Sequence, residues 1–243
     1  MDSYLLNPDY LLRQDGNRVI LCSKRELCYG GEEWFTFIHP FQAMMLSFFN
    51  GENPLENEIA NCARFFNIPF EKMHKIILPF IENKEMVSLR DKQGHCVLFP
   101  REILVKRTQE VNRQQNYCVS DFKYIGTPDY KQIRLDYPVY VNMELIMKCY
   151  TDCCYCYANR KAFGKNCMPT EKVLDFIQEA YDSGVLEMDI NGGEVLLHSG
   201  IYDILKKLIE CHYSPLISTK MPIGEKVITL IPQHYNLTLF ISS

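Results

Sequence analysis

The stretch Cys149-Tyr-Thr-Asp-Cys153-Cys-Tyr-Cys156, called the cysteine loop below, decides how the rest of the chain is interpreted. It follows residues 139–145, in which apolar and more polar side chains alternate with the period of a β-strand. Cys149, Cys153 and Cys156 have the spacing C-x3-C-x2-C. Three thiolates in a loop after a strand can hold three irons of a four-iron cluster and leave one iron open, whereas an electron-transfer cluster normally takes four cysteines. The spacing therefore predicts an iron–sulfur site with one open position.

A zinc site is the alternative interpretation of the same cysteines, with Cys154 or Cys167 as the fourth ligand. Zinc sites usually combine two C-x2-C arms, and the sequence offers no second arm. The chain has 11 cysteines and no recognisable secretory signal, which favours metal binding over disulfides. The scattered cysteines are expected to be buried thiols, and they are Cys22, Cys28, Cys62, Cys96, Cys118 and Cys211.

From residue 137 onward, predicted strands and helices alternate, which is typical of an α/β fold with a parallel sheet. We expect strands at 139–145, 185–190, 216–219 and 237–242, and helices at 169–183, 201–213 and 225–231. Gly192, Gly193 and Glu194, called the Gly-Gly-Glu turn below, follow the second strand. Two glycines allow the backbone to approach a ligand closely. In such folds the functional groups lie at the carboxyl ends of the strands, where this turn and the cysteine loop are both expected.

The cysteine loop and the Gly-Gly-Glu turn, one strand–helix unit apart, resemble the radical S-adenosylmethionine superfamily. Tyr155, the aromatic residue before the last cysteine, belongs to the same pattern. The sequence departs from the pattern at Tyr150, where asparagine is common, and at Val195, where proline is usual. The resemblance implies a partial (β/α) TIM-like barrel over residues 137–243. The last strands of such a barrel have no counterpart in the sequence, so we expect a truncated piece of a longer protein, whose activity by itself is not assured.

The same resemblance implies two cofactors, a 4Fe-4S cluster and S-adenosylmethionine. Cys149, Cys153 and Cys156 would ligate the cluster. The residues implied in binding S-adenosylmethionine are Tyr155, Gly192, Gly193, Glu194, Ser218, Lys220 and Ser242. For the last three of these, the alternative is an ordinary role as strand-end hydroxyls or as a surface charge.

Residues 1–105 are expected to form a separate α+β module, followed by a linker over 106–136. The predicted elements are strands at 10–12, 19–22 and 34–38, helices at 40–50, 54–66 and 69–83, and a hairpin over 86–99. Three strands, three helices and a hairpin make a winged-helix-like module. Many such modules bind DNA, but acidic residues slightly outnumber basic ones here, which excludes a strong phosphate-binding face. The charge favours a peptide or protein partner.

This order of elements resembles the leader-peptide recognition domain of enzymes that modify ribosomally made peptides. The resemblance implies that an extended leader adds to the edge of the three-stranded sheet and packs against helix 71–83. The residues implied at that edge are Trp34, Phe35, Thr36 and Phe37. The alternative is that Trp34 and Phe37 are only core residues.

Together the two resemblances imply a radical S-adenosylmethionine peptide maturase. Reductive cleavage of the cofactor to a 5′-deoxyadenosyl radical would modify a precursor peptide by a thioether, a carbon–carbon crosslink or an epimerisation. The implied partners are a precursor peptide with a leader and an electron donor such as flavodoxin or ferredoxin. A sulfatase-maturing type of radical enzyme acting on a protein or small molecule, and a non-catalytic peptide-binding fragment, stay open as alternatives.

The overall charge and hydropathy exclude two further classes of partner. The net charge is −4, and no apolar stretch is long enough to span a bilayer. We therefore expect no nucleic-acid partner, no membrane partner and a cytoplasmic location.

Overall fold

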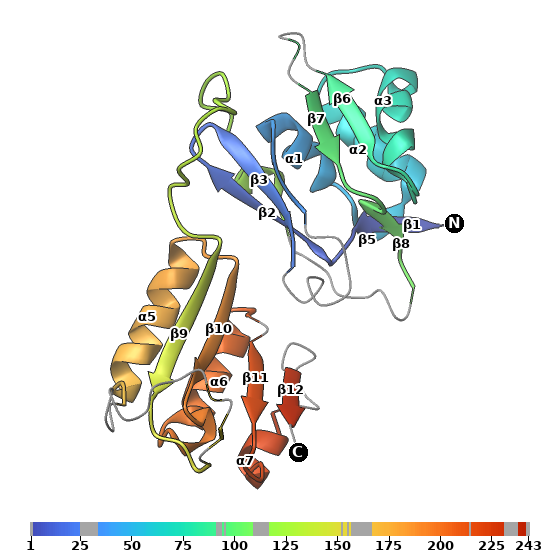
Figure 1. Cartoon of the computed structure of the whole chain (residues 1–243). Helices are drawn as coiled ribbons and strands as arrows, with labels where there is room; N and C mark the ends of the chain where they lie inside the picture. The colour runs from blue at the N-terminus through green and yellow to red at the C-terminus, as the bar shows by residue number, and fades with distance from the viewer. Residues whose placement is uncertain are drawn as a thin grey trace. The chain divides into compact units, whose positions relative to one another are not determined.

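The structure is a computed structural model of the chain, and it divides into two compact units, Met1–Asp136 and Tyr137–Ser243 (Figure 1). It describes residues 2–24, 34–90, 94, 96–108, 117–151, 153, 154, 156, 167–213, 215–230 and 238–241. For residues 216 and 238–241 only the backbone is described. Within the described residues, no helix has the length and apolar character needed to cross a bilayer.

The first unit contains the three strands, three helices and hairpin predicted from the sequence. In chain order its elements are β1 (Ser3–Leu6), β2 (Tyr10–Asp15), β3 (Arg18–Ser23), β4 (Phe35–Ile38), α1 (Pro40–Leu46), β5 (Asn50–Pro54), α2 (Leu55–Phe65), α3 (Phe70–Ile77), β6 (Val87–Arg90), β7 (Cys96–Phe99) and β8 (Leu104–Lys106). Strands β2, β3 and β4 form an antiparallel sheet in that order, and β6 pairs with β7.

Two of the predicted helices are shorter in the structure than in the prediction. Helix α1 ends at Leu46, whereas the sequence predicted a helix up to residue 50. Helix α3 ends at Ile77, and the chain continues as a short 3-10 turn, Leu78–Phe80, instead of reaching residue 83. Pro79 explains the second difference, because proline has no backbone N–H for the helical ladder and its ring clashes with the preceding turn.

A second antiparallel sheet, which was not predicted from the sequence, has β1 between β5 and β8. Strand β5 reads Asn50-Gly-Glu-Asn-Pro54, a composition typical of turns, and Gly51 has a φ of 79°. It is extended because it pairs with β1, about 50 residues away in the sequence, and this pairing leaves no local signal.

The core of the first unit lies between the β2–β3–β4 sheet, the three helices and β7. Val19, Leu21 and Ile38 of the sheet are completely buried there, together with Leu46 of α1 and Ile77 of α3. Alternate residues of β3 face the two sides of the sheet, yet every residue of this strand is buried. Both faces of the sheet are therefore covered at β3.

The prediction of buried thiols is confirmed for Cys22, Cys62 and Cys211 and wrong for Cys96 and Cys118, which are exposed. Cys96 lies on β7, where the neighbouring positions 97 and 99 take the inward side, so the strand period turns its thiol outward. Cys118 precedes a short 3-10 turn. Cys28 lies outside the described residues.

Residues 117–136, predicted as part of a linker, belong to the first unit in the structure. Phe122 is buried in the core of that unit. The hydroxyl oxygen of Tyr117 accepts a hydrogen bond from the backbone N–H of Leu12 on β2, at 2.9 Å. Burial of this phenol raises its pKa above the ordinary value. Although the segment is mostly polar, its aromatic residues Tyr117 and Phe122 attach it to the first unit.

Arg18 is the centre of the contact between this segment and the sheet. The side chain is 2% exposed, and its Nε donates to Asp15 Oδ2 at 3.0 Å. Its two terminal nitrogens donate to the backbone carbonyls of Asp129 at 2.8 Å, of Gln132, and of Arg134 at 3.4 Å. A guanidinium group has five N–H donors in a planar fork, so one side chain can satisfy several carbonyls of an irregular segment.

The same arginine also contacts the predicted peptide-binding strand. Its guanidinium carbon lies 3.5 Å from the centroid of the Phe37 ring on β4. Asp15, the ion-pair partner of Arg18, accepts a further hydrogen bond from the backbone N–H of Asp136 at 2.9 Å. The buried pair of Arg18 and Asp15 thus fixes the chain up to the last residue of the first unit.

We expect Arg18→Met to destabilise the first unit by about 3 kcal/mol, because Asp15 would keep a buried, unpaired charge. Urea unfolding followed by the fluorescence of Trp34, the single tryptophan of the chain, measures this change. The control is Arg90→Met on the exposed side of β6, with an expected change below about 0.5 kcal/mol. Equal stability of the two variants would contradict the role assigned to Arg18.

The second unit alternates strands and helices, as predicted. Its elements are β9 (Tyr140–Ile146), α5 (Thr170–Asp182), β10 (Glu187–Gly192), α6 (Ile201–Glu210), β11 (Leu216–Thr219), α7 (Glu225–Ile228) and β12 (Thr238–Ile241). Strand β9 is parallel to β10, and β11 is parallel to β12. These small sheets confirm a mixed α/β unit with parallel strands, whereas a closed TIM-like barrel is not shown by the described residues.

The helices of this unit pack against one face of the β9–β10 sheet. Met143 and Leu145 of β9 and Met188 and Ile190 of β10 are buried in that core with the inner sides of α5 and α6. The alternate positions on these strands are polar, and they include the Tyr140 hydroxyl, which donates to Asp189 Oδ2 at 3.1 Å. The unit therefore has an apolar helix-covered face and a polar face.

Candidate functional site

The carboxyl ends of three strands meet in the second unit. Strands β9, β10 and β11 run in the same direction, as their arrowheads in Figure 1 show, and β10 contacts β11. The cysteine loop follows β9, the Gly-Gly-Glu turn ends β10, and Lys220 follows β11. The topology therefore brings together groups that lie far apart in the sequence, at the end of the sheet where α/β proteins place their functional groups.

The Gly-Gly-Glu turn lies directly against the end of β9. Gly193 N donates to Ile146 O at 2.6 Å, and Glu194 N donates to Lys148 O at 2.9 Å. A Cβ atom on Gly192 would collide with the Ile146 carbonyl oxygen, and one on Gly193 would collide with the Lys148 carbonyl oxygen. Gly192 also has a φ of 133°, which favours glycine. The two glycines are therefore required by the close approach of two backbones.

The side chain of Glu194 is buried and joins the turn to β11. Only 3% of the residue is exposed. Its Oε1 accepts hydrogen bonds from Thr219 Oγ1 at 2.8 Å and from Leu196 N at 3.3 Å. Its Oε2 accepts one from Lys220 N at 3.1 Å. A buried carboxylate needs such donors to replace water, and here one side chain collects donors from two segments.

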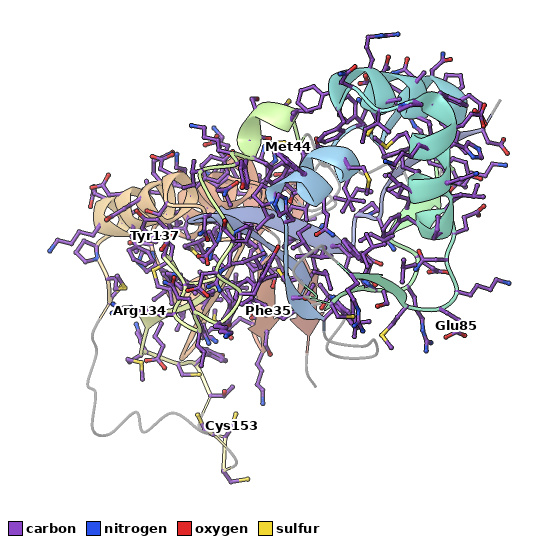
Figure 2. The ribbon with its side chains drawn as sticks, turned by 90° about the horizontal axis from the view of Figure 1, so that it is seen from above. Phe35, Met44, Glu85, Arg134, Tyr137 and Cys153 are labelled. Atoms are coloured by element: carbon purple, nitrogen blue, oxygen red, sulfur yellow. The ribbon has the colours of Figure 1, made fainter. Side chains whose placement is uncertain are left out.

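The cysteine loop reaches the end of β11 through Lys220. Lys220 Nζ donates to Cys153 Sγ at 3.3 Å. The Thr151 hydroxyl lies 3.2 Å from Cys153 Sγ and 3.7 Å from Cys149 Sγ, so it bridges the two thiols. Both thiols are half-buried, whereas Cys156 is exposed and donates its backbone N–H to Cys153 O at 3.1 Å. Figure 2 labels Cys153 in this loop, with sulfur in yellow.

The stretch that contains the cysteine loop is closed at its base. Ile146 and Cys167 form an antiparallel bridge, and Met168 N donates to Leu145 O at 3.0 Å. His198 also contacts this base. Its Nε2 lies 2.7 Å from Met168 O, and its Nδ1 accepts a hydrogen bond from Gly200 N at 3.1 Å. The tautomer with the proton on Nε2 satisfies both bonds.

The donor chemistry suits an iron–sulfur cluster, although the ligands are not gathered. Cys149 and Cys153 are thiols joined through one hydroxyl, and Cys156 is a third thiol in the same loop. Among the residues that the structure describes, no three Cys, His, Asp or Glu side chains are close enough to hold a metal ion. Cys154 and Cys167, the alternative zinc ligands, are both exposed.

The remaining predicted cofactor residues have different positions. Lys220 lies between Glu194 and Cys153, as described above. Ser218 is exposed on β11, on the opposite side of the strand from Thr219, which is 1% exposed. Tyr155 and Ser242 lie outside the described residues.

Three residues of the site were not predicted from the sequence: Thr151, His198 and Thr219. Only Thr219 had a signal in the sequence. In a strand with Ile217 directed inward, the period of two also directs residue 219 inward and residue 218 outward. Thr151 contacts its neighbours Cys149 and Cys153 within an irregular loop, and His198 contacts the distant Met168, and neither kind of contact leaves a periodic signal in the sequence.

The predicted peptide edge lies in the first unit, at β4. Ser23 N donates to Trp34 O at 2.8 Å, so the alternation of an antiparallel ladder directs the N–H and C=O groups of Phe35 and Phe37 away from β3. Among the described strands none pairs with that outer edge, although β7 lies nearby. Phe35, labelled in Figure 2, is 49% exposed.

The four side chains predicted at this edge have unequal surroundings. Trp34 packs against the core, and its indole nitrogen is buried without a hydrogen-bond partner among the described residues. Phe37 is half-buried, and its ring is covered by Arg18. The rings of Phe35 and Phe37 are in a T-shaped arrangement, with centroids 5.4 Å apart. Of these four side chains, only that of Phe35 is exposed.

Comparison with solved structures shows which fold the chain shares. No protein-family model matches the sequence, and no curated protein matches it. The crystal structure of Streptococcus suis SuiB bound to S-adenosylmethionine matches with a TM-score of 0.53 and 17% identity, over 99% of this chain and 48% of that chain. SuiB bound to the precursor peptide SuiA matches with a TM-score of 0.54 and 16% identity, over the same shares. At these identities the likeness shows the fold alone, and this chain spans about half the length of the matched proteins.

We expect Gly193→Ala to displace the turn from β9 and to destabilise the second unit by about 1–3 kcal/mol, because the added methyl group meets backbone atoms. Faster amide hydrogen exchange in β9 and β10 measures this loosening. Gly224→Ala is the matched control, because a Cβ atom there meets nothing within 4 Å. Unchanged exchange in Gly193→Ala would refute the close approach described above.

Proposed function

We propose that this chain binds an iron–sulfur cluster and S-adenosylmethionine and belongs to a radical S-adenosylmethionine enzyme that modifies a precursor peptide. The observation that carries the proposal is the meeting of the cysteine loop, the Gly-Gly-Glu turn and Lys220 at the ends of three parallel strands. The likeness in fold to a protein solved with S-adenosylmethionine and with a precursor peptide supports it.

In this proposal Cys149, Cys153 and Cys156 hold the cluster in the cysteine loop. When bound, a cluster with one open iron supplies the electron for reductive cleavage of S-adenosylmethionine. The hydroxyl of Thr151 contacts the first two thiols and orients them, and the closed base of the loop fixes where it leaves β9. The protein's own part is to hold these groups in place and to keep water away.

The cofactor itself is proposed to lie between the Gly-Gly-Glu turn and the end of β11. Lys220 Nζ is beside Cys153, so a ligand of the cluster with a carboxylate group would meet an ammonium group there. The two glycines let the turn pack against the Ile146 and Lys148 carbonyls, and this packing sets the position of the turn next to the end of β11. Ser218, Tyr155 and Ser242 complete the proposed set.

The peptide is proposed to bind as an added strand at the outer edge of β4. Main-chain hydrogen bonds from Phe35 and Phe37 would supply most of the affinity, as in other cases of β-strand addition. The side chain of Phe35 is exposed beside that edge and can contact the peptide. Binding at a module separate from the chemistry raises the local concentration of the segment to be modified.

Anaerobic reconstitution with iron and sulfide tests the cluster. We expect the absorbance and electron paramagnetic resonance of a 4Fe-4S cluster, a change in the resonance on adding S-adenosylmethionine, and loss of both in a triple substitution of Cys149, Cys153 and Cys156 by Ala. Binding of zinc without a cluster would overturn the proposal. A cluster whose electron paramagnetic resonance does not change on adding S-adenosylmethionine would overturn the proposed binding of this cofactor.

Alkylation followed by mass spectrometry identifies the ligands independently. The reconstituted chain should protect Cys149, Cys153 and Cys156 from iodoacetamide, and removal of the cluster should expose them. Cys62 serves as an internal reference, because its burial raises the pKa of its thiol to about 12 and keeps it unreactive in both states. Protection of Cys154 or Cys167 in place of one of the three would correct the ligand set.

Peptide binding is tested with synthetic peptides, encoded by any short open reading frames that are found beside the gene. Trp34 adjoins β4 and is the only tryptophan, so its fluorescence should change on binding. Phe35→Pro removes an outward N–H without breaking the ladder to β3 and should weaken binding by about tenfold or more. Phe65→Ala, an exposed aromatic residue of α2, should leave the affinity unchanged. Full affinity in Phe35→Pro would argue for a fragment that does not bind peptides at this edge.

A further inference from the structure

Thr219 has a hydroxyl whose two hydrogen bonds are both fixed by the structure. Its Oγ1 accepts from Met221 N at 3.0 Å, and so the hydroxyl proton is free to be donated to Glu194 Oε1 at 2.8 Å. The residue is 1% exposed and Glu194 is 3% exposed. Water is therefore excluded from this bond, and its direction is set by the backbone of residue 221.

The carboxylate of Glu194 is largely occupied by protein donors. It accepts from the Thr219 hydroxyl, from Leu196 N and from Lys220 N. A carboxylate offers about four lone-pair sites, so the protein uses most of its capacity. The backbone N–H of the same residue is donated to Lys148 O, one residue before Cys149. One residue thus joins the ends of β9, β10 and β11.

We propose that Thr219 is a positioning residue, and that Glu194 serves S-adenosylmethionine binding through this bond and not as the ion-pair partner of the cofactor. The inference rests on the proposed function, since it concerns how that site is held. Thr219 and Glu194 set the distance between the Gly-Gly-Glu turn and the backbone of Lys220. The ammonium group of Lys220, which contacts Cys153, is thereby held over the cysteine loop.

Substitutions can distinguish the two possible roles of Glu194, which are an ion pair with the cofactor and a hydrogen bond with Thr219. An ion pair between Glu194 and the cofactor would depend on the negative charge of this residue alone. The bond to Thr219 depends equally on both partners, so loss of either leaves the other buried and unsatisfied. Two residues that act as one unit give non-additive effects, whereas independent contributions add.

The experiment measures the affinity of the reconstituted chain for S-adenosylmethionine by calorimetry, and the unfolding midpoint of the cluster-free chain. The variants are Thr219→Val, Thr219→Ser, Glu194→Met, which removes the carboxylate acceptor, and the double variant Thr219→Val/Glu194→Met. Thr229→Val is the matched control, because it also removes a threonine hydroxyl, here one that donates to Lys226 O on the surface at the end of α7.

We expect Thr219→Val and Glu194→Met each to weaken binding by about tenfold, and the double variant to bind no more weakly than the worse single one. Thr219→Ser keeps the hydroxyl and should restore the affinity, and Thr229→Val should match the unchanged chain. A merely structural role would lower the unfolding midpoint and leave the affinity measured well below that midpoint unaltered.

Two outcomes would overturn the inference. One is a loss of binding in Glu194→Met with nearly unchanged affinity in Thr219→Val, which is the result expected for a direct ion pair. The other is additivity of the two substitutions in the unfolding midpoint. If the unchanged reconstituted chain binds no S-adenosylmethionine, the proposed function fails, and non-additive midpoints would still support the bond between Thr219 and Glu194 as a fixed contact of the fold.

Discussion

The close approach of the Gly-Gly-Glu turn to the Ile146 and Lys148 carbonyls, at the end of β9 and just after it, is the constraint on which the second unit's site depends. Side chains at Gly192 or Gly193 would occupy the space of those carbonyls. Because backbone meets backbone there, Glu194 can bond β9 through its N–H and β11 through its carboxylate. The position of Lys220, and through it the contact with Cys153, follows from this arrangement.

In each unit one buried charged side chain holds several distant segments together, and its charge is positive in the first unit and negative in the second. In the first unit, buried Arg18 donates to carbonyls of an irregular segment, and in the second, buried Glu194 accepts from N–H and hydroxyl groups of another strand. A buried ionic group is tolerated only when its hydrogen-bonding capacity is filled. Each of these residues therefore requires several distant segments to be in place at once, which makes the arrangement specific.

Local patterns in the sequence were sufficient for most helices and strands but not for the contacts between distant segments. The period of β9, the start of α5 and the strand β11 could be predicted because their signals lie within a few residues. Strand β5 could not, since its turn-like residues are extended only by pairing with β1. Likewise Cys149 and the Gly-Gly-Glu turn were recognisable, whereas the pairing of Thr219 with Glu194 depends on the fold itself.

The bridge between Ile146 and Cys167 has a consequence for how such a chain can diversify. The residues between them leave β9 and return to it at fixed points, whatever lies in between. The entropy of closing a loop rises only with the logarithm of its length, and a doubling costs about 0.6 kcal/mol. Insertions between these two points would therefore be nearly neutral for stability. The spacing of the cysteines between these two points and the fold of the second unit can therefore evolve independently.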